Sequence, residues 1–350
     1  MHVGIPQVIS VGTAVPSYCL RQEDIKGFVA SLFRDNLHNL ERLLPVFENS
    51  LIKARHLSQP LEWYAKPHTF AEANRIYEQV AFELAEQAST QAIERSGIGL
   101  ADIGMIIFVS STGIATPTLD ARLIQTLGLP PDTARLPVWG LGCAGGVTGI
   151  ARAAQFSYSL QGKAVLLVAV ELCSLTFQRG DYSKANLVGT SLFADGAAAA
   201  VIAPGGYGPA IIDSYSTLFP DTEDIMGWDI VEGGLQVRFS RDIPSIIRRY
   251  LPELTGCLCN RHDVQLDAIE HYVVHPGGAK VLGAYAESLN LPQDKLNDAY
   301  AVLARYGNMS SVSVLFVLER FMATVKPSDR YGLMLALGPG FSAEQVLLRW

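Results

Sequence analysis

The sequence predicts an α/β protein made of two duplicated halves. Apolar runs rich in β-branched residues alternate with amphipathic stretches, which is typical of sheets covered by helices on both faces. A strand, a glycine-containing turn and a helix follow one another at Cys143, and the same order recurs at Asn308. Glycines and prolines in "PGGYGP" at 204–209 separate the two copies. We therefore expect one half at residues 1–205 and the other at 206–350.

The first half is expected to alternate strands and helices. The stretch "PQVISVGTAVP" at 6–16 is typical of a strand that stops at glycine and proline. Residues 21–55 have a helical, amphipathic pattern. The clearest helix follows, because apolar residues recur every four positions at Ile76, Val80, Leu84, Ala88 and Ala92. Gly97 is expected to end that helix. Further elements are expected as strands at 102–112, 134–142 and 163–172, a turn at Asp195 and Gly196 into one more strand, and a helix at 145–160.

The second half repeats this order. Residues 267–278 predict a strand that ends in a loop, and 279–291 predict a helix. A glycine-led turn opens an apolar helix within 305–325, as at Cys143. Residues 331–350 predict a strand, a Gly-Pro-Gly turn and a final strand.

The composition is ordinary for a soluble enzyme. Of 350 residues, 49% are apolar and 17% charged, which is enough apolar material for a sizeable core. The net charge of −7, without a basic block, argues against a nucleic acid as partner. Apolar runs such as 164–173 are shorter than the roughly 20 residues of a membrane span. No signal-peptide pattern stands at the N-terminus, so neither a membrane span nor export is expected.

The five cysteines are odd in number and scattered, which is no disulfide framework and favours the cytoplasm. Cys257 and Cys259 form a C-x-C pair without a second ligand cluster, so we expect no metal there.

Cys143 stands out within "WGLGCAGGVTG" at 139–149. A turn that leads from a strand into a helix places its residue at the helix N-terminus, where free N–H groups and the dipole favour a thiolate. The glycines leave room for a substrate carbonyl. This is the arrangement of a nucleophile elbow, with a lowered thiol pKa expected. A small buried cysteine in a tight turn would show the same local pattern.

His275 and Asn308 are candidate partners of Cys143. His275 follows a buried strand in "VVHPGG", and Asn308 lies in "YGNMSS" at the turn that corresponds to Cys143. Ligands gather at the carboxyl ends of strands in open α/β sheets, and both side chains can donate to an oxyanion. Taken singly, each also fits a plain structural histidine or a helix N-cap.

Several motifs together resemble the type III polyketide synthases, the chalcone synthase-like branch of the thiolase superfamily. These are "LGCAGG", "VVHPGG", "YGNMSS", "LGPGF", "LVGTSLFADGAA" at 187–198 and "ELCSLTF" at 171–177. The resemblance implies a thiolase-like five-layer αβαβα fold, a homodimer, CoA thioesters as substrates and no bound cofactor. It also implies a triad of Cys143, His275 and Asn308.

The chemistry that the resemblance implies suits these side chains. The Cys143 thiolate takes a starter acyl group from its CoA thioester. Malonyl-CoA loses CO₂, and His275 and Asn308 hydrogen-bond the oxygen of the resulting enolate. The enolate carbon attacks the acyl group, and the cycle repeats before ring closure.

Alignment to the plant enzymes places the substrate cavity. Phe193 matches one of two gating phenylalanines, while the second position falls on Val237, or on Phe239 if the register slips by two. Cys173 and Thr176 match cavity-lining threonines, although ordinary strand packing would also explain them. The small side chains favour a long starter, and "SSTGIATP", "ELCSLTF" and "MGWDIVEGG" look closest to bacterial alkylpyrone and alkylresorcinol synthases, which use fatty acyl-CoA. The remaining substrate candidates are Thr112, Thr116 (a methionine position that enters the partner's cavity in the plant enzymes), Gly338, Pro339 and Gly340.

The CoA entrance departs from the plant pattern. Of three basic positions, only Arg42 keeps its charge, because Pro45 and Asn49 occupy the other two. Lys53, Arg241 and Lys280 are candidates to replace the lost charges, and an acyl-carrier protein remains a possible starter donor.

Three other functions remain open. A ketoacyl-ACP synthase III-like enzyme would stop after one condensation. A non-catalytic acyl-binding protein would consume nothing, and a cysteine hydrolase would cleave thioesters without malonyl-CoA. The starter length, the number of extensions and the type of ring closure are not defined by the sequence.

Overall fold

The structure is a computed structural model that describes residues 4–326 and 328–350. Its centre is a nine-stranded mixed sheet in the order β11-β12-β13-β8-β1-β7-β6-β4-β5. The sheet has two parts, because β1 and β8 pair only through Gln7 and Ala210, whereas β8 pairs with β13 along its length. The strands are β1 (Pro6–Ala14), β4 (Ile103–Val109), β5 (Ala134–Val138), β6 (Ala164–Leu172), β7 (Asp195–Pro204), β8 (Ala210–Leu218), β11 (Ile269–Val274), β12 (Tyr331–Gly338) and β13 (Ser342–Arg349).

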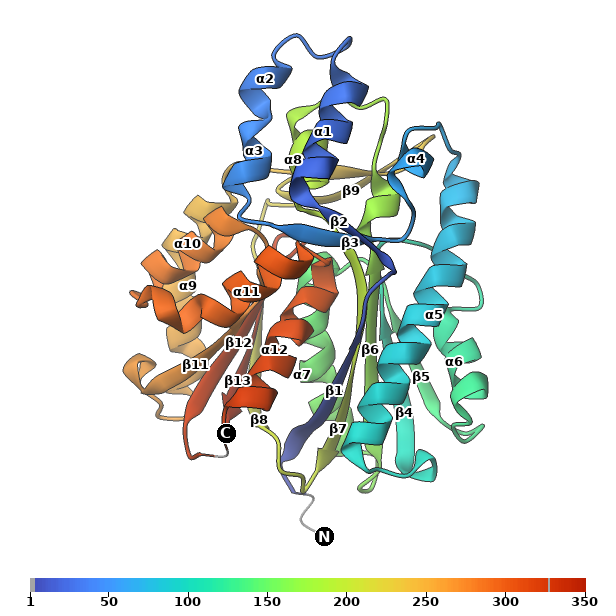
Figure 1. Cartoon of the computed structure of the whole chain (residues 1–350). Helices are drawn as coiled ribbons and strands as arrows, with labels where there is room; N and C mark the ends of the chain where they lie inside the picture. Colours follow the sequence, from blue (N-terminus) through green and yellow to red (C-terminus); the bar gives the residue numbers. More distant parts are fainter. Residues whose placement is uncertain (1–3, 327) are drawn as a thin grey trace.

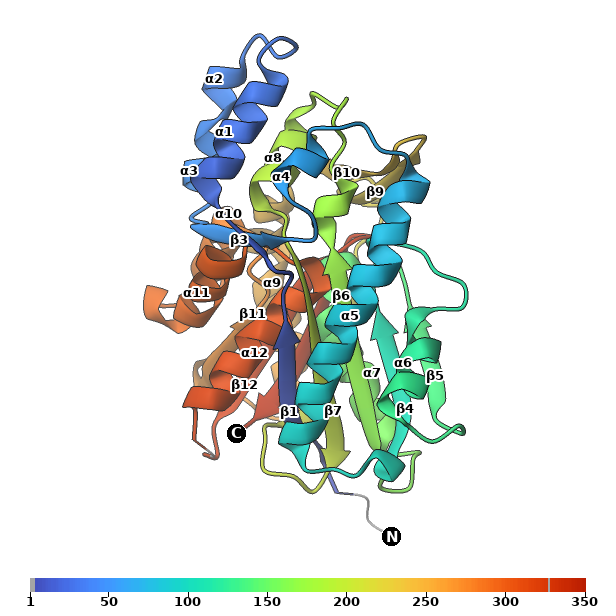
Figure 2. The same cartoon turned by 45° about the vertical axis from the view of Figure 1, so that its right-hand side comes forward.

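Helices cover both parts of the sheet and fill the space between them (Figure 1). The helices α5 and α6 pack on the outer face of the β1–β5 part, and Figure 2 shows α5 running along it. On the other part, α9 packs against β8 and β13, and α10 packs on α9. Between the parts, α7 and α12 contact strands of both, which gives five layers. The bounds are α5 (Phe70–Ser96), α6 (Leu119–Leu127), α7 (Gly145–Ser157), α9 (Ile243–Asn260), α10 (Ala279–Ser288), α11 (Asn297–Tyr306) and α12 (Ser313–Thr324).

The two central helices approach each other closely because small residues lie between them. A Cβ on Gly146 of α7 would stand 2.2 Å from the carbonyl oxygen of Ser311 and 2.8 Å from Val314 of α12. Larger side chains at Gly146 would therefore push the two helices apart. The close approach brings together the turns that precede the helices, and these turns carry Cys143 and Asn308.

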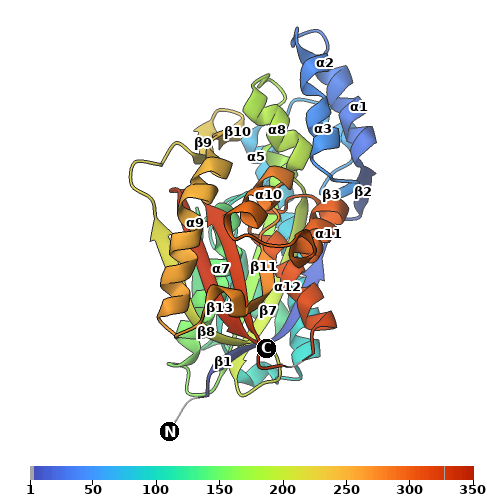
Figure 3. The same ribbon diagram turned by 90° about the vertical axis from the view of Figure 1, so that its left-hand side faces the viewer.

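A cap of shorter elements lies over one end of the sheet (Figure 3). It comprises α1 (Gln22–Phe33), α2 (Leu40–Leu43), α3 (Pro45–Asn49), α4 (Leu61–Tyr64), α8 (Lys184–Leu192), the pair β2 (Tyr18–Arg21) and β3 (Ala54–Leu57), and the pair β9 (Met226–Val231) and β10 (Gly234–Phe239).

The predicted helix at 21–55 is correct only in part. Helices occupy most of 22–49, but residues 54–57 form β3, which pairs with β2. Burial in β3 alternates from residue to residue, as in a strand with one covered face. The predicted strands at 102–112 and 134–142 end earlier, at Val109 and Val138, because the chain then turns toward the site. The elements β2, β8, β9, β10, α4, α6, α8, α9 and α11 were not predicted.

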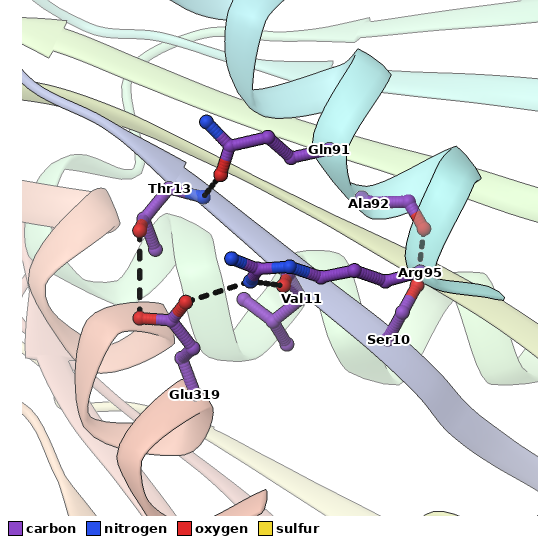
Figure 4. Close-up of polar contacts among 7 residues, drawn as sticks. All are labelled: Ser10, Val11, Thr13, Gln91, Ala92, Arg95 and Glu319. Atoms are coloured by element: carbon purple, nitrogen blue, oxygen red, sulfur yellow. Dashed lines mark hydrogen bonds and ion pairs between the residues drawn. The ribbon is translucent and has the colours of Figure 1, made fainter. Parts of the chain in front are cut away.

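Helix α5, strand β1 and helix α12 are joined by a polar network (Figure 4). Arg95 of α5 donates to the carbonyl oxygen of Val11 at 2.6 Å and to Glu319 of α12 at 2.8 Å. Thr13 of β1 donates to the same carboxylate at 3.4 Å. The network thus fixes an outer helix to a central helix across the edge of β1.

In the part of the chain that the structure describes, no helix is both long and apolar enough to cross a bilayer.

Candidate active site

Cys143 lies in a short 3-10 turn, Gly142–Ala144, immediately before α7. The turn is tight: Gly142 has φ +46°, and a Cβ there would stand 2.9 Å from Pro339. A Cβ on Gly338 would stand 2.5 Å from the Cβ of Ala144. The turn between β12 and β13 therefore packs directly on the cysteine turn, and both glycines are needed for this contact.

Asn308 lies beside Cys143 in the turn before α12. Its backbone N–H donates to Leu192 O at 2.8 Å, and its carbonyl oxygen accepts from Ala194 at 2.9 Å. Its side-chain amide donates to Gly277 O at 3.0 Å and accepts from the N–H of Ser310 at 2.8 Å. These contacts fix the amide, and it and Ser310 hydrogen-bond the Cys143 thiol.

His275 follows β11 and lies two residues before Gly277, whose carbonyl oxygen accepts from the Asn308 amide. Its N–H donates to Leu335 O at 2.8 Å, and the N–H of Gly277 donates to the His275 carbonyl at 3.0 Å. The imidazole is buried, and neither ring nitrogen has a hydrogen-bond partner among the described residues. An unpaired buried imidazole is free to bind a substrate oxygen.

Burial dominates the electrostatics of this site. It raises the pKa of the Cys143 thiol to about 12, against the opposing hydrogen bonds of Ser310 and Asn308. It also lowers the pKa of His275 to about 3. The expected fall of the thiol pKa was therefore wrong, because loss of water outweighs the effect of the helix N-terminus. Formation of a thiolate here therefore requires transfer of the thiol proton to a base.

Glu171 connects the loops that carry the site, and sequence reasoning did not select it. This buried carboxylate accepts from the N–H of Ser111 and the hydroxyl of Thr112, both at 2.9 Å, and from the hydroxyl of Ser311 at 2.8 Å. Ser111 in turn accepts from the N–H of Gly142 at 3.1 Å. The available signal was a lone charge at the end of the buried run "AVLLVAVEL".

Glu171 provides a test of this network through pH. Burial raises its pKa from an ordinary 4.5 to about 7, so the fold favours the protonated acid. Its contribution to stability is complete below about pH 4.5 and is lost as the pH rises through 7, an effect of about 3 kcal/mol. The side-chain amide of a glutamine keeps both sets of contacts if the Ser311 hydroxyl becomes the acceptor. We therefore expect Glu171→Gln to remove this loss of stability at higher pH. Thermal unfolding of both proteins from pH 4.5 to 8.5 checks it, and parallel curves would contradict it.

A mostly apolar cavity, with Arg55 as the charged residue of its wall, lies behind Phe193 and contains four of the predicted substrate residues: Cys173, Thr176, Phe193 and Val237. Its other walls come from the cap, mainly from α1, β3, α4 and α8. They are Ile25, Phe28, Arg55, Leu57, Leu61, Tyr64, Ser174, Phe177, Asn186, Gly189 and Thr190.

Both proposed positions of the second gating residue lie on one face of β10. Val237 lines the cavity, while the ring of Phe239 is 5.5 Å from the ring of Phe193. Trp228 of β9 adds a third ring, 5.7 Å from Phe193. The aromatic contact of Phe193 therefore comes from Phe239 and Trp228.

The remaining predicted residues are more scattered. Thr112 is buried against Glu171 and lines a separate small hollow with Thr176. Gly340 faces Leu218 rather than the cysteine turn, and Thr116 is exposed. The four CoA candidates, Arg42, Lys53, Arg241 and Lys280, are exposed on separate segments, and within residues 4–326 and 328–350 none of their side chains makes a hydrogen bond or ion pair.

Two family models match almost the whole chain. They are "Chalcone and stilbene synthases, N-terminal domain" over residues 1–206 and the corresponding C-terminal domain over residues 210–350. The chain belongs to the chalcone and stilbene synthase family. The family and the thiolase-like fold predicted from the sequence are thereby confirmed, since solved type III polyketide synthases share the architecture.

Relatives in the chalcone and stilbene synthase family cover nearly the full chain. The 1,3,6,8-tetrahydroxynaphthalene synthase of Streptomyces peucetius subsp. caesius is 39% identical over 350 residues, 98% of this chain and 93% of that protein. The crystal structure of the synthase of that name from Streptomyces coelicolor A3(2) is 30% identical with a TM-score of 0.94, covering 98% and 99%. PKS-I of the brown alga Ectocarpus siliculosus is 26% identical with a TM-score of 0.93, covering 100% and 99%.

Membership in the chalcone and stilbene synthase family defines the type of reaction. The protein is a type III polyketide synthase, an acyl-transferring enzyme that depends on malonyl-CoA. Members of this family use CoA substrates and need no cofactor. Within the described ranges, no group of His, Cys, Asp and Glu side chains could hold a metal ion.

Proposed function

We propose that this type III polyketide synthase extends a fatty acyl starter with malonyl units and cyclises the product to an alkylpyrone or alkylresorcinol. The observation that carries the proposal is the apolar cavity behind Phe193 and Cys173. A buried alkyl chain gains about 0.8 kcal/mol per CH₂. A cavity walled by Ile25, Phe28 and Leu61 therefore favours a long chain over a short one.

The proposed roles follow the geometry of the site. Cys143 sulfur attacks the starter thioester carbonyl and forms an acyl–sulfur bond. The thiol proton passes through His275 to the sulfur of CoA, which leaves as its thiol, and the imidazole is neutral again. Malonyl-CoA then loses CO₂, and the electron pair of the broken bond becomes the enolate. The imidazole of His275 and the amide of Asn308 donate to the enolate oxygen. The enolate carbon bonds to the acyl carbon and displaces Cys143 sulfur.

We propose that the two halves of the chain meet at the 205/206 boundary and carry different catalytic residues. Cys143 belongs to the first half, and His275 and Asn308 belong to the second. Arg42, Lys53, Arg241 and Lys280 are proposed contacts of CoA phosphates. An acyl-carrier protein as starter donor is tested by supplying the same acyl group on either carrier. The cytoplasm remains the proposed location, from cysteine usage.

A second candidate is a synthase primed by malonyl-CoA itself. The relative from Streptomyces peucetius is a 1,3,6,8-tetrahydroxynaphthalene synthase, and another, 30% identical, is the phloroglucinol synthase of Pseudomonas fluorescens. Neither name includes an alkyl chain. This candidate makes a polyhydroxylated aromatic without any added starter.

One product panel separates these functions. The protein is incubated with malonyl-CoA alone and with acetyl-, hexanoyl-, lauroyl- or palmitoyl-CoA, and products are identified by mass spectrometry. Alkylpyrones or alkylresorcinols from the longer starters support the proposal. An aromatic product from malonyl-CoA alone supports the second candidate. A single β-ketoacyl thioester would indicate a ketoacyl-ACP synthase III-like reaction, free acid without malonyl consumption a hydrolase, and no turnover an acyl-binding protein.

Cys173→Phe tests the path of the starter. Cys173 is buried and lines the cavity, so an aromatic ring there fills space that a long chain needs. Overpacking costs typically 1–3 kcal/mol, so we expect roughly ten- to 100-fold loss of kcat/KM with palmitoyl-CoA and near-normal activity with hexanoyl-CoA. Cys259→Phe, a change at a buried cysteine of α9, is the control for a general packing defect. Unchanged chain-length preference would mean that the starter lies elsewhere.

We also propose a homodimer formed along the outer edge of β5. This strand ends the sheet, and Ile114 and Trp139 beside it are 46% and 52% exposed. Together with Ala115 and Pro137 they line an apolar hollow, and Thr116 lies next to it. Burial of this patch against a second copy would direct Thr116 toward the partner. Sedimentation should give about twice the 37.9 kDa of one chain, and a monomer at micromolar concentration would contradict the proposal.

A further inference from the structure

Arg55 is among the most buried charged side chains of the protein. It belongs to β3, a strand that runs between the cap helices and the sheet (Figure 1), and it is 2% exposed. Of its side-chain nitrogens, Nε and Nη2 have no hydrogen-bond partner among the residues that the structure describes. Burial lowers its pKa to about 9, so the guanidinium remains charged at neutral pH. A buried cation that uses one nitrogen is costly, and its retention calls for a reason.

The nitrogen that is used holds the end of α8. Nη1 donates to the carbonyl oxygens of Thr190 at 2.8 Å and Phe193 at 2.6 Å. These are carbonyls of the last turn of α8 and of the residue that follows it. Without the guanidinium these two carbonyl oxygens would be buried without this donor, and a lost hydrogen bond there costs about 1–3 kcal/mol of stability.

The segment that Arg55 holds is the support of Asn308. Leu192 O accepts from the N–H of Asn308 at 2.8 Å, and Ala194 donates to Asn308 O at 2.9 Å. Phe193 and Asn308 thus form a short parallel β-bridge. A change in the position of Phe193 would move the Asn308 amide with it.

The aliphatic stem of Arg55 packs against Gly307, in the turn that carries Asn308. A Cβ on Gly307 would stand 2.8 Å from Cδ and 2.9 Å from Cγ of Arg55. Gly307 also has φ +72°, so glycine serves both the conformation and the contact. Arg55 therefore contacts both sides of the bridge: it bonds the Phe193 side and packs against the Asn308 side.

We propose that Arg55 is a positioning residue of the decarboxylation step, which holds the amide of Asn308 through the Phe193–Asn308 bridge. The inference rests on the proposed role of Asn308 in stabilising the enolate. It does not extend to the acyl loading of Cys143, which lies in the turn before α7 and is not part of this bridge. Loss of Arg55 should therefore separate the two half-reactions.

The test uses the full chain and measures both half-reactions. Acyl transfer from acyl-CoA to Cys143 is followed by intact mass, and CO₂ release from [carboxyl-¹⁴C]malonyl-CoA by trapping. Arg55→Met keeps the stem and removes the donors; we expect decarboxylation to fall about ten- to 100-fold and loading to change less than about threefold. Arg55→Lys restores a charge and a donor and should recover part of the loss. Arg95→Met removes another arginine from a backbone carbonyl far from the site, and should leave the ratio of the half-reactions unchanged.

The decisive comparison combines Arg55→Met with Asn308→Ala. If Arg55 acts through Asn308, the double variant decarboxylates at the rate of Asn308→Ala alone, whereas independent effects would multiply and overturn the inference. A raised KM for malonyl-CoA at unchanged kcat would make Arg55 a substrate ligand and also overturn it. If Arg55→Met does not fold, the same cycle is run with Arg55→Lys. If Arg55→Met decarboxylates malonyl-CoA at the normal rate while Asn308→Ala is slowed, only this inference is overturned. If Asn308→Ala also decarboxylates at the normal rate, the proposed function of Asn308 is overturned and the inference with it.

Discussion

Cys143→Ala is expected to form no acyl adduct and no polyketide. The thiol lies in the tight glycine-containing turn immediately before α7, and alanine offers no nucleophile there. Removal of a catalytic nucleophile elsewhere costs about 10⁴-fold or more in turnover. Intact-protein mass after incubation with acyl-CoA gives the adduct, and product analysis with malonyl-CoA gives the turnover.

The controls follow from the positions of the other cysteines. Cys19 and Cys257 are exposed and can exchange with thioesters without any catalysis. Cys19→Ala and Cys257→Ala should therefore keep the adduct that depends on Cys143. An adduct of unchanged size and rate on Cys143→Ala would rule out the assignment.

Asn308→Ala is expected to lower malonyl-CoA decarboxylation by about 100- to 1000-fold, the effect of removing one oxyanion donor in other enzymes. The amide is held by Gly277 O and the N–H of Ser310, so the protein fixes it before any charge develops. Acyl loading on Cys143 should fall much less. Radiolabelled CO₂ release and intact mass, measured on the same sample, give both rates.

A second variant and a surface control test whether the effect comes from the donating amide of Asn308. Asn308→Asp keeps the size but replaces the donating amide by a carboxylate, so it should decarboxylate no faster than Asn308→Ala. Asn297→Ala, at the start of α11, is a surface control for the loss of an amide. Loss of loading with decarboxylation retained would reverse the assigned roles.

Much of the architecture was predictable because its signals are local. Alternation of buried strands with helices, the glycines around Cys143 and the recurrence at Asn308 each depend on a few adjacent residues. The strand at 54–57 was missed because four residues that alternate in burial fit equally well inside a longer helical pattern. The strands of the β9–β10 hairpin are short and mostly half-buried, so their sequence carries little apolar alternation.

The parts of the site that escaped prediction depend on contacts between distant segments. Glu171 and Arg55 are charged residues whose burial is visible only once strands and turns far apart in sequence are packed together. The thiol pKa was misjudged for the same reason: the helix N-terminus is a local feature, whereas burial depends on the whole fold. The choice between Val237 and Phe239 needed the packing of β10, which places Val237 in the wall of the cavity and the ring of Phe239 against that of Phe193.

The order of strands in the sheet has a consequence for synthesis of the protein. Strand β8 is flanked in the sheet by β1, which it barely touches, and by β13, which follows it in the chain only after β9 to β12. While the chain is being made, one edge of β8 therefore waits uncovered, and an open strand edge is a template for aggregation. We therefore expect the nascent chain to be more prone to aggregation before β13 has been made and has paired with β8.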